Sequence, residues 1–541
     1  MREDTFDYIV TGAGSAGCAV AGRLSEGGQY RVLLLEAGPR DKRFWIHTPV
    51  GFTKVFTDPT VNWKFESEPV ASLNQRRLYQ PRGKVLGGTS SINGTVYMRG
   101  RPLDYDGWRQ RGCVGWDWDS VLPYFRKAED QSRGESDLHG IGGPLHVSDV
   151  PHEWPLAAAM IDAAVESGIE RNDDFNGPTQ LGAGYYQFTA KRGRRWSSAR
   201  AYLSNATQRS NLHVQPNAQA TRVIVNDGRA TGVEYRLNGK VTVAHARIEV
   251  VVSGGTFGSP HLLQLSGIGP GALLQEHGIP VISDRREVGE NLHDHFNTYL
   301  AYRCRNAITL NDLATSAVRR WWEGAKYVLG ATSLLSNTGV YAGAFVKSDP
   351  GLEEADLQIN FLAWSTAERR HDGVVPHDFS GITLSPVHLR PEGRGHVRLR
   401  SSDPSSPPAI QFIFLTNDYD RRAIVHGMRV CRDIAAQPAF ARYISEEVLP
   451  GPDVVSDEAL LADVRERAIA NYHPVGTCRM GSDPEAVVDP RLRVNGVAGL
   501  RVADASVMPQ IIAGNTNAPS IMIGEKAAHM ILEDARKGPA A

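Results

Sequence analysis

A glycine-rich turn near the N-terminus constrains the fold of this chain more than any other feature. The apolar run Tyr8–Val10 leads into Gly12-x-Gly14-x-x-Gly17, and an alanine-rich, helix-forming segment follows. This order predicts a strand, a tight turn and a helix, whose N-terminus binds a pyrophosphate through backbone N–H groups and the positive end of its dipole. Glycine is required because a Cβ would block both the turn and the approach of the backbone to phosphate.

A second predicted strand, residues 31–35, ends at Glu36, which lies 19 residues after Gly17. An acidic side chain at this point accepts hydrogen bonds from the hydroxyls of an adenosine ribose and repels a 2′-phosphate. The two strands, the helix and Glu36 together predict a dinucleotide site. These residues alone do not distinguish NAD from FAD.

The composition fits an enzyme with a large core. The chain has 541 residues, of which 41% are hydrophobic and 22% charged, so we expect two or three structural units. A net charge of −1 and the lack of a basic tract argue against a nucleic-acid partner. The five cysteines are scattered, which argues against a disulfide scaffold, a structural zinc site and a redox disulfide.

The sequence gives no sign of secretion or of a membrane span. The chain enters its first strand without a secretory leader, and no window approaches the ~20 apolar residues of a spanning helix. We therefore expect a soluble, cytoplasmic protein without a transmembrane segment. The stretch 319–327, Arg-Arg-Trp-Trp-Glu-Gly-Ala-Lys-Tyr, is compatible with a membrane interface, but we favour a helix that borders the substrate pocket.

Strand and helix patterns divide the chain into several segments. Helical periodicity recurs near residues 118–130 and 155–168, and residues 211–254 alternate as a β meander with turns at Asn226 and Asn238. The last strand of the meander enters a glycine-rich turn and another helix. Near the C-terminus a short strand reaches Asp504, and a final helix is expected over residues 519–532, with Asn517 as its N-cap.

Five stretches of the chain resemble signatures of the glucose–methanol–choline (GMC) oxidoreductases, a family of FAD-dependent enzymes. The matches follow the family's order along nearly the whole chain and look closest to the choline dehydrogenase-like branch. The resemblance therefore implies FAD as the cofactor. The matching stretches are Gly12–Gly17 with Glu36, Gly83–Asp106, Gly255–Gly269, Val288–His295, and Asn471–Thr477 with Asp504 and Gly514–Asn517.

The pattern and the resemblance together predict an α/β fold with two domains. A Rossmann-like FAD-binding domain, discontinuous in sequence, is expected to comprise residues 1–150, 211–300 and 466–541. A second, α+β substrate domain built on an antiparallel sheet is expected to comprise residues 151–210 and 301–465.

His473 is the candidate catalytic base. Oxidation of an alcohol through a flavin moves a hydride to flavin N5, and the hydroxyl proton needs a base near pKa 7, which points to histidine. Pro474 restricts the backbone of His473 to extended conformations, and Gly476 breaks any helix, so the imidazole is held rigidly. From the residues alone a buried structural histidine is the alternative. The family's His-Pro-x-Gly-Thr pattern implies the base, and it implies Asn515 as a neighbour that donates a hydrogen bond to the substrate oxygen.

The resemblance also implies which residues contact FAD. The loop after Gly87-Gly88 would lie against the pyrophosphate and the isoalloxazine, and a helix that begins near Ala518 would direct its N-terminus at the N1–C2=O edge of the flavin. The predicted FAD-binding residues are Gly12, Gly14, Ser15, Ala16, Gly17, Glu36, Ala37, Arg82, Gly83, Val85, Gly87, Gly88, Ser91, Asn93, Gly94, Val96, Val223, Asp504, Ala505, Thr516 and Asn517.

Two further expectations concern the cofactor and metals. Some choline oxidases bond the flavin covalently to a histidine in the loop that matches Thr89–Asn93. Ile92 stands at that position here, so we expect non-covalent FAD. We expect no metal site, because His293 and His295 have no third ligand at a useful spacing.

The expected function is that of an FAD-dependent alcohol oxidase or dehydrogenase, which converts a primary alcohol, aromatic or aliphatic, to the aldehyde. Trp321, Trp322, Phe361 and Trp364 would suit an aromatic or medium aliphatic alcohol, and no aromatic cage with a carboxylate indicates choline. The partners are then a small-molecule alcohol and an electron acceptor, either O2 or a quinone or other carrier; a homodimer is left open. The alternative is a GMC-fold flavoprotein of non-redox or different chemistry, of lyase or photodecarboxylase type.

Overall fold

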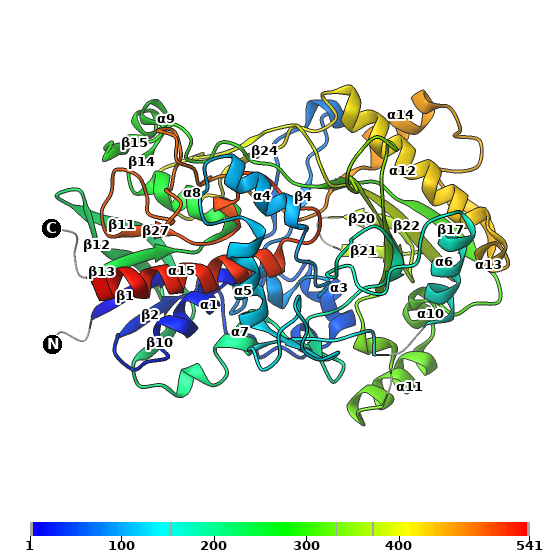
Figure 1. The fold of residues 1–541 in the computed structure, drawn as a ribbon, viewed down its shortest axis with the longest axis horizontal. Coiled ribbons are helices and arrows are strands. Elements are labelled where there is room, and N and C mark those ends of the chain that lie inside the picture. The colour runs from blue at the N-terminus through cyan, green and yellow to red at the C-terminus, as the bar shows by residue number, and fades with distance from the viewer. Residues whose placement is uncertain (1–3, 152–153, 332, 371–372, 538–541) are drawn as a thin grey trace.

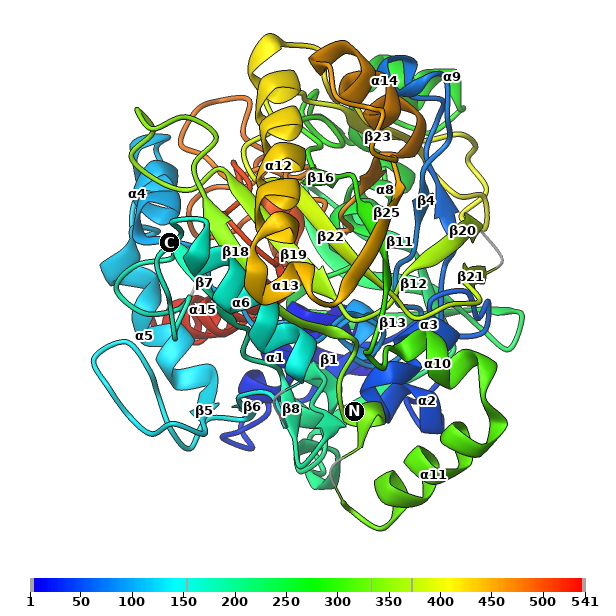
Figure 2. The ribbon, with the colours of Figure 1, turned by 90° about the vertical axis from the view of Figure 1, so that its right-hand side faces the viewer.

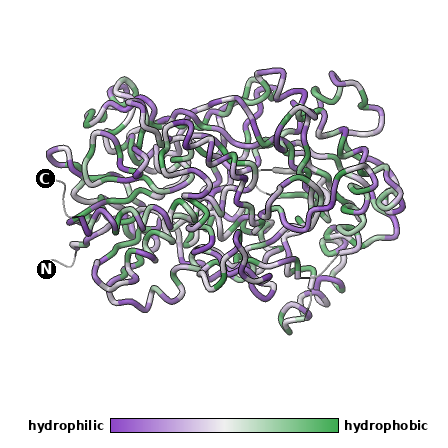
Figure 3. Tube along the Cα trace, in the orientation of Figure 1, coloured by the Kyte–Doolittle hydropathy of each residue, from purple (hydrophilic) through white to green (hydrophobic). Residues whose placement is uncertain are grey.

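The computed structural model describes residues 4–151, 154–331, 333–370 and 373–537. In Figure 1 the described chain forms two halves that lie side by side, each with a sheet at its centre. Runs of hydrophobic residues follow the strands of both halves, as Figure 3 shows, and each half encloses its own large cluster of buried apolar side chains. The predicted combination of a Rossmann-like domain with a second, antiparallel sheet is confirmed.

The first sheet contains the predicted parallel strands. β1 lies between β2 and β13 and is parallel to both. On their other sides, β2 pairs in parallel with β10, and β13 pairs in parallel with β27. All four residues of β2 are buried, as is usual when helices cover both faces of a parallel sheet. The parallel strands, in spatial order, are β10 (Leu212–Gln215), β2 (Val32–Leu35), β1 (Thr5–Thr11), β13 (Lys240–Val252) and β27 (Leu500–Val502).

The predicted β meander extends this sheet. Strands β11 (Ala218–Asn226) and β12 (Arg229–Leu237) pair antiparallel with each other, and β12 pairs with the first half of β13. Asp227 and Asn238 have positive φ angles of 50° and 51°, each followed by a glycine with positive φ. This is the backbone that two-residue hairpin turns require, so the turn prediction is confirmed.

Two helices that are far apart in the sequence pack together beside this sheet. α1 (Ser15–Leu24) lies against α15 (Asn517–Lys537), coloured blue and red in Figure 1. A Cβ on Gly524 would come 2.5 Å from the carbonyl oxygen of Ala16, so the two backbones are in close contact. The Arg23 guanidinium, in the last turn of α1, lies 2.8 Å from the fully buried carboxylate of Glu525, the residue after Gly524.

The N-cap predicted for the last helix is wrong by one position. Asn517 is the first residue of α15 rather than its cap. Its side-chain oxygen accepts a hydrogen bond from the Ser15 hydroxyl at 2.7 Å, so the amide joins α15 to α1 instead.

The second sheet is antiparallel. Its main path runs in the order β25, β17, β22, β19, β18, β7, while β16 pairs with both β22 and β26. Figure 2 shows α12 (Asp418–Ala436) and α6 (Pro155–Glu166) on the face of this sheet that is turned toward the viewer. The strands are β7 (Gly182–Tyr185), β16 (Phe296–Asn297), β17 (Leu300–Cys304), β18 (Val340–Val346), β19 (Leu357–Leu362), β22 (Gly381–His388), β25 (Ile444–Leu449) and β26 (Ile469–Ala470).

Shorter elements complete the described chain. The exact domain boundaries stay a prediction; β16 and β26 fall inside the segments predicted for the FAD-binding domain, yet pair in the second sheet. The other helices are α2 (Phe44–His47), α3 (Phe52–Val55), α4 (Pro102–Gln110), α5 (Trp118–Ala128), α7 (Ser198–Tyr202), α8 (Gly255–Leu265), α9 (Gly271–Glu276), α10 (Leu310–Thr315), α11 (Ala317–Val328), α13 (Pro438–Ala441) and α14 (Asp457–Arg467). The small two-stranded sheets are β3 (Phe65–Glu66) with β4 (Tyr79–Gln80), β5 (Glu129–Gln131) with β6 (Leu145–Val147), β8 (Ala190–Lys191) with β9 (Arg194–Arg195), β14 (Ile268–Gly269) with β15 (Ser283–Asp284), β20 (Thr366–Arg370) with β21 (Gly373–Pro376), and β23 (His396–Arg398) with β24 (Ala409–Gln411).

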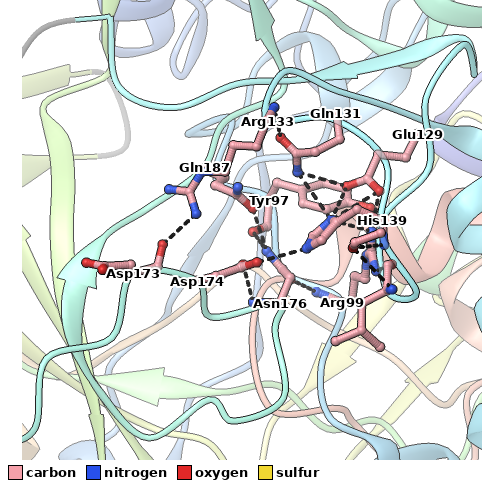
Figure 4. A network of polar contacts seen from close by, with 12 residues as sticks. Tyr97, Arg99, Glu129, Gln131, Arg133, His139, Asp173, Asp174, Asn176 and Gln187 are labelled. Carbon is pink, nitrogen blue, oxygen red and sulfur yellow. Dashed lines mark hydrogen bonds and ion pairs between the residues drawn. The ribbon is translucent and has the colours of Figure 1, made fainter.

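A buried ionic network holds the segment that follows the Asn93–Val96 loop. The Arg99 guanidinium forms an ion pair with Glu129, and both side chains are completely buried. His139 lies between two carboxylates, with Nδ1 3.1 Å from Glu129 and Nε2 2.8 Å from Asp174 (Figure 4). Burial opposes these charges, but the Arg99 and His139 partners hold the pKa of Glu129 below its ordinary value. The network therefore stabilises the chain only while every charge keeps its partner.

Replacement of Glu129 by alanine leaves the Arg99 charge buried without its carboxylate. We expect Glu129→Ala to lower the free energy of unfolding by about 3–5 kcal/mol. The matched control is Glu135→Ala, which removes the exposed partner of Arg126 and should change stability by at most about 0.5 kcal/mol. Urea unfolding followed by tryptophan fluorescence measures both, and equal effects of the two substitutions would contradict the prediction.

Candidate active site

A large cavity lies where the two halves meet. Its volume is about 1110 Å³, and it is lined by the carboxyl ends of β1, β2 and β27 from the first sheet and by β18, β19 and β22 from the second. The N-terminal residues of α1 and of α15 both line it. Two helix N-termini directed into one cavity favour the binding of anionic groups.

The first glycine turn has the geometry that a phosphate site needs. Gly12 has φ +99°, and a Cβ there would lie 2.3 Å from the carbonyl oxygen of Ser253. A Cβ on Gly17 would lie 1.9 Å from the carbonyl oxygen of Gly12. Gly14 differs, because it lines the cavity and a Cβ on it would meet no atom within 4 Å. The first and third glycines are therefore needed for packing, and the second keeps open a space that a Cβ would fill.

A second glycine loop closes over the first. A Cβ on Gly88 would come 2.7 Å from the Cα of Gly14, so the two loops pack backbone to backbone. The amide of Gly87 donates a hydrogen bond to the carbonyl oxygen of Ala13 at 2.8 Å. These contacts bring Gly83, Gly88 and Asn93–Val96 to the cavity wall.

Glu36 and Asp504 lie at the ends of two parallel strands, as predicted. The Glu36 carboxylate accepts hydrogen bonds from the amides of Ala13 at 3.0 Å and Gly38 at 2.8 Å, and burial raises its pKa to about 7. The Asp504 carboxylate accepts hydrogen bonds from the amide of Gly255 at 2.8 Å and from the amide of Ser506, in the turn that follows it. Both carboxylates thus fix backbone around the cavity while they also line it.

Most of the predicted FAD-binding residues are brought together. Five do not line the cavity: Gly17 packs behind the first turn, Gly87 and Ser91 hold the second loop, and Val85 and Val223 lie in hydrophobic cores. Strand β11 contributes residues 218–220 to the wall instead of Val223. The predicted residues that line the cavity are Gly12, Gly14, Ser15, Ala16, Glu36, Ala37, Arg82, Gly83, Gly88, Asn93, Gly94, Val96, Asp504, Ala505, Thr516 and Asn517.

The predicted catalytic pair is adjacent in space. His473 and Asn515, 42 residues apart, both line the cavity, and the Asn515 amide nitrogen lies 3.0 Å from His473 Nε2. The side-chain oxygen of Asn515 is buried and has no partner among the described residues. A buried polar atom without a partner is costly, so this amide is suited to a ligand.

A chain of hydrogen bonds fixes which nitrogen of His473 carries the proton. The carbonyl oxygen of Ile512 lies 3.1 Å from His295 Nε2 and can only accept, so this nitrogen is protonated. Burial lowers the pKa of His295 well below its ordinary value, so His295 is neutral and its Nδ1 is an acceptor. In this chain of contacts His473 Nδ1, 3.1 Å away, is the donor; the Asn471 amide, 3.3 Å from the same nitrogen, can then accept only through its oxygen. His473 Nε2 is then the acceptor of the ring, and its lone pair accepts a hydrogen bond from the Asn515 amide nitrogen.

The ring of His473 is neutral and its backbone is held tightly. Burial, and then the charge of Arg82, lowers the pKa of His473 to about 3, below the value near 7 that we expected from the sequence. The preceding Tyr472 has a positive φ of 64°, a strained conformation. Its carbonyl accepts from Arg82 at 2.6 Å, and the amide of His473 donates to Asp294 at 2.8 Å. Both contacts stabilise the strained turn that orients the imidazole.

Three residues that support this arrangement were not predicted as site residues. His295 and Asp294 belong to the stretch Val288–His295, which matches a family signature but was considered for a role only as a metal site. Arg195 is completely buried and donates to Asn93 at 2.7 Å and to the carbonyl oxygen of Ser90 at 3.2 Å, so it fixes the second glycine loop. The match of Val288–His295 to a family signature offered a signal for Asp294 and His295; nothing in the sequence singled out Arg195.

The ring nitrogens of His293 and His295 have partners within the protein. His293 Nδ1 lies 2.7 Å from the carbonyl oxygen of Asn291, and its Nε2 accepts from the amide of Ile511 at 2.8 Å. Within residues 4–537, apart from the gaps given above, no group of three or more His, Cys, Asp or Glu side chains could hold a metal ion.

The role predicted for residues 319–327 is wrong. They form a helix, α11, but none of its residues lines the cavity. Trp321 and Trp322 are exposed, and Phe361 lies in the core, so of the four aromatic residues proposed for the pocket only Trp364 lines it. Hydrophobic pattern alone could not tell a pocket-facing helix from one with an outward apolar face.

Family models for the GMC oxidoreductases match residues 6–297 and 391–524. The chain belongs to the GMC oxidoreductase family. It is 42% identical over 532 residues to an alcohol dehydrogenase [acceptor] of Pseudomonas putida, across 97% of this chain and 96% of that protein. It is 43% identical over 534 residues to an oxygen-dependent choline dehydrogenase of Rhizobium johnstonii, across 97% and 95% of the two chains.

Solved structures agree with this assignment. A pyridoxine 4-oxidase from Mesorbium loti matches with a TM-score of 0.88 and 28% identity, over 98% of this chain and 99% of that one. A formate oxidase from Aspergillus oryzae, whose FAD modification was studied in a variant, matches with a TM-score of 0.92 and 27% identity over 99% and 100%. This GMC oxidoreductase is thus an FAD-dependent enzyme that acts on CH–OH groups.

The residues present fit the cofactor. Gly14 keeps open the space in front of the α1 N-terminus, Glu36 lies at the end of β2, and the α15 N-terminus faces the same cavity. These groups would hold the pyrophosphate, the adenosine ribose and the flavin edge, respectively. Within the described part of the chain, none of the helices combines the length with the hydropathy that a membrane span requires.

The open position at Gly14 gives a direct test of FAD binding. We expect Gly14→Ala to weaken FAD binding by about tenfold or more, because the Cβ would project into the phosphate space. The fold should persist, since that Cβ meets no protein atom within 4 Å. Gly107→Ala is the matched control, because Gly107 lies in α4 with equally open surroundings outside the cavity. Fluorescence titration with FAD measures both, and tight binding by Gly14→Ala would contradict the assignment.

Proposed function

We propose that this GMC oxidoreductase converts a neutral primary alcohol to the aldehyde, with His473 as the general base. FAD, when bound, accepts the hydride from the carbinol carbon. The observation that carries the proposal is the pairing of His473 Nε2 with the Asn515 amide at 3.0 Å, on a ring whose tautomer is set by His295. A base that is neutral and already points its lone pair into the cavity is what proton abstraction from a hydroxyl requires.

The two side chains would share one hydroxyl group. The alcohol oxygen enters between them, donates its proton to His473 Nε2 and accepts a hydrogen bond from the Asn515 amide. As the C–H bond breaks, the O–H proton passes to Nε2, and the carbonyl oxygen that forms keeps the hydrogen bond to Asn515. The imidazolium that results is stabilised through Nδ1–H, which donates to His295. Asn515 cannot compete for the proton, since an amide nitrogen is only a donor.

The cavity wall from the second sheet supports an uncharged substrate. Its polar groups are neutral amides and a hydroxyl, from Asn297, Asn360 and Ser385, and its other residues are Val340, Leu362 and Ile469. Among described residues, the carboxylates that line the cavity are Glu36, Asp504 and the exposed Glu66, none of them from that sheet. A quaternary ammonium substrate would need an aromatic cage with a nearby carboxylate. We therefore favour an aliphatic or aromatic alcohol, as for the alcohol dehydrogenase relative, over choline.

The state of the cofactor and its reoxidation complete the proposal. Ile92 lines the cavity in the loop after Gly88, and its alkyl side chain cannot form a covalent bond to the flavin. FAD is therefore expected to be released by acid precipitation. The electron acceptor is O2 or a quinone or another carrier, and reoxidation of the reduced enzyme in air distinguishes the first from the others.

Anaerobic mixing of the FAD-loaded enzyme with a panel of alcohols tests the function. We expect neutral primary alcohols to bleach the flavin absorbance faster than choline does. His473→Gln should slow this reduction by about 10²–10⁴-fold, because it removes the base while FAD stays bound. His245→Gln, an exposed histidine on β13, is the control and should change nothing. Bleaching of His473→Gln at the rate of the unaltered enzyme would refute the role of His473, and a flavin that no alcohol reduces would refute the oxidation itself.

The lowered pKa of His473 predicts the pH dependence. The base acts in its neutral form, which persists above its pKa and is lost as pH falls through it, and burial places that pKa at about 3 in the free enzyme. We therefore expect kcat/KM for the alcohol to show no loss from His473 protonation between about pH 5 and 8. Steady-state kinetics over this range measure it. An acid limb near pH 7 that disappears in His473→Gln would contradict the assignment.

A further inference from the structure

Helix α11 presents its apolar side to solvent and its polar side to the protein. The face that packs inward carries Glu323 and Tyr327, both buried. The Glu323 carboxylate accepts from the amide of Leu334 at 2.8 Å and from the Ser333 hydroxyl at 3.0 Å. A surface helix normally has the opposite arrangement, with its apolar stripe toward the core.

The outward side, which we call the tryptophan face, is a continuous stripe at helical spacing. It consists of five residues: Val318, Trp321, Trp322, Val328 and Leu329. Both tryptophans lie three or four positions after Val318, Val328 and Leu329 follow them after seven, and Leu329 comes directly after the helix end. Figures 1 and 2 both show α11 at the edge of the molecule, away from the two sheets. The exposed fractions are 78% for Val318, 73% for Trp321, 57% for Trp322, 73% for Val328 and 83% for Leu329.

A second short helix lies beside it. The ring of Phe44 in α2 is 6.2 Å from the ring of Tyr327, and the Tyr327 hydroxyl donates to the carbonyl oxygen of His47 at 3.4 Å. Phe44 and Trp45 are themselves exposed, at 53% and 42%. The next helix along the chain, α3, begins at Phe52, which lines the cavity. The exposed apolar region thus adjoins an element of the cavity wall.

The surroundings of the tryptophan face are basic. Residues 40–47 and 309–330 together carry six basic and three acidic side chains, whereas the whole chain has a net charge of −1. Arg43, Arg319 and Lys326 form ion pairs with Asp58, Asp312 and Glu323, so the unbalanced positive charge comes from Arg40, Lys42 and Arg320. α2 also contacts β9, and the β8–β9 turn adds Arg192 and Arg194. A short helix with tryptophans on one side and Lys and Arg beside them is typical of segments that lie in the interface of an anionic bilayer.

We propose that the tryptophan face, with α2, docks this enzyme onto the surface of an anionic phospholipid bilayer. Trp321 and Trp322 would enter the headgroup region, where amphipathic rings are favoured, and the basic residues would contact lipid phosphates. A second copy of the chain is a poorer occupant. A two-fold contact through this face would bring the same basic residues together. The proposal concerns where the enzyme lies and does not depend on its substrate.

Flotation of the FAD-loaded enzyme with lipid vesicles tests the proposal. We expect binding to vesicles of equal parts phosphatidylglycerol and phosphatidylcholine, weaker binding as salt rises, and little binding to pure phosphatidylcholine. Trp321→Ser with Trp322→Ser should weaken binding by about tenfold or more, because the buried apolar area is lost. The matched control is Val241→Ser with Val455→Ser, which alters two residues that are 61% and 59% exposed on other surfaces.

Two further measurements keep the test decisive. Lipids brominated on the acyl chain should quench the tryptophan fluorescence of the unaltered enzyme, without any substitution. Flavin absorbance reports that each variant keeps its fold. Equal vesicle binding by both double variants, or an absence of quenching, would overturn the proposal. A third result would also overturn the proposal: the unaltered enzyme is a dimer in light scattering, the Trp321→Ser/Trp322→Ser variant alone is a monomer, and the unaltered enzyme does not bind vesicles. The tryptophan face would then be an interface between copies of the chain.

Discussion

The close packing of α1 against α15 is the contact on which the active site depends. Ala16 and Gly524 let the two backbones touch, and the Arg23–Glu525 ion pair fixes their relative rotation. Both N-termini are thereby directed into the same cavity. One supplies the first glycine turn and the other supplies Asn515 through the turn before α15. A larger side chain at either contact would separate the phosphate site from the catalytic amide.

The chemistry of the site rests on a neutral hydrogen-bond chain rather than on charges. A backbone carbonyl, which can only accept, sets the proton on His295, and His295 in turn sets the proton on His473. Each link is buried, so the neutral forms are favoured. In the proposed mechanism, an imidazole that is prepared in this way needs no reorientation when an alcohol binds, which would lower the cost of the proton transfer.

At the surface, helix α11 places its apolar residues differently from the two core sheets. The core sheets bury their apolar residues, whereas α11 exposes them and holds on to the protein through Glu323 and Tyr327. This inversion places tryptophans and arginines together on one edge of the molecule. Trp321 and Trp322, which do not line the cavity, are thus part of an exposed apolar surface.

The sequence by itself determined the local geometry and the chemical class. Gly12 and Gly17 have no substitute in so tight a turn, Gly14 keeps the space in front of the helix open, and His473 beside Pro474 has few backbone conformations, so both motifs could be recognised from short patterns. The parallel and antiparallel sheets followed from strand periodicity and from the family resemblance. Only the tertiary structure decided which side of α11 faces outward, that Asn517 binds Ser15 instead of capping its helix, and that Arg195, Asp294 and His295 support the site. These outcomes depend on contacts between segments far apart in the chain, and no local spacing carries information about such partners.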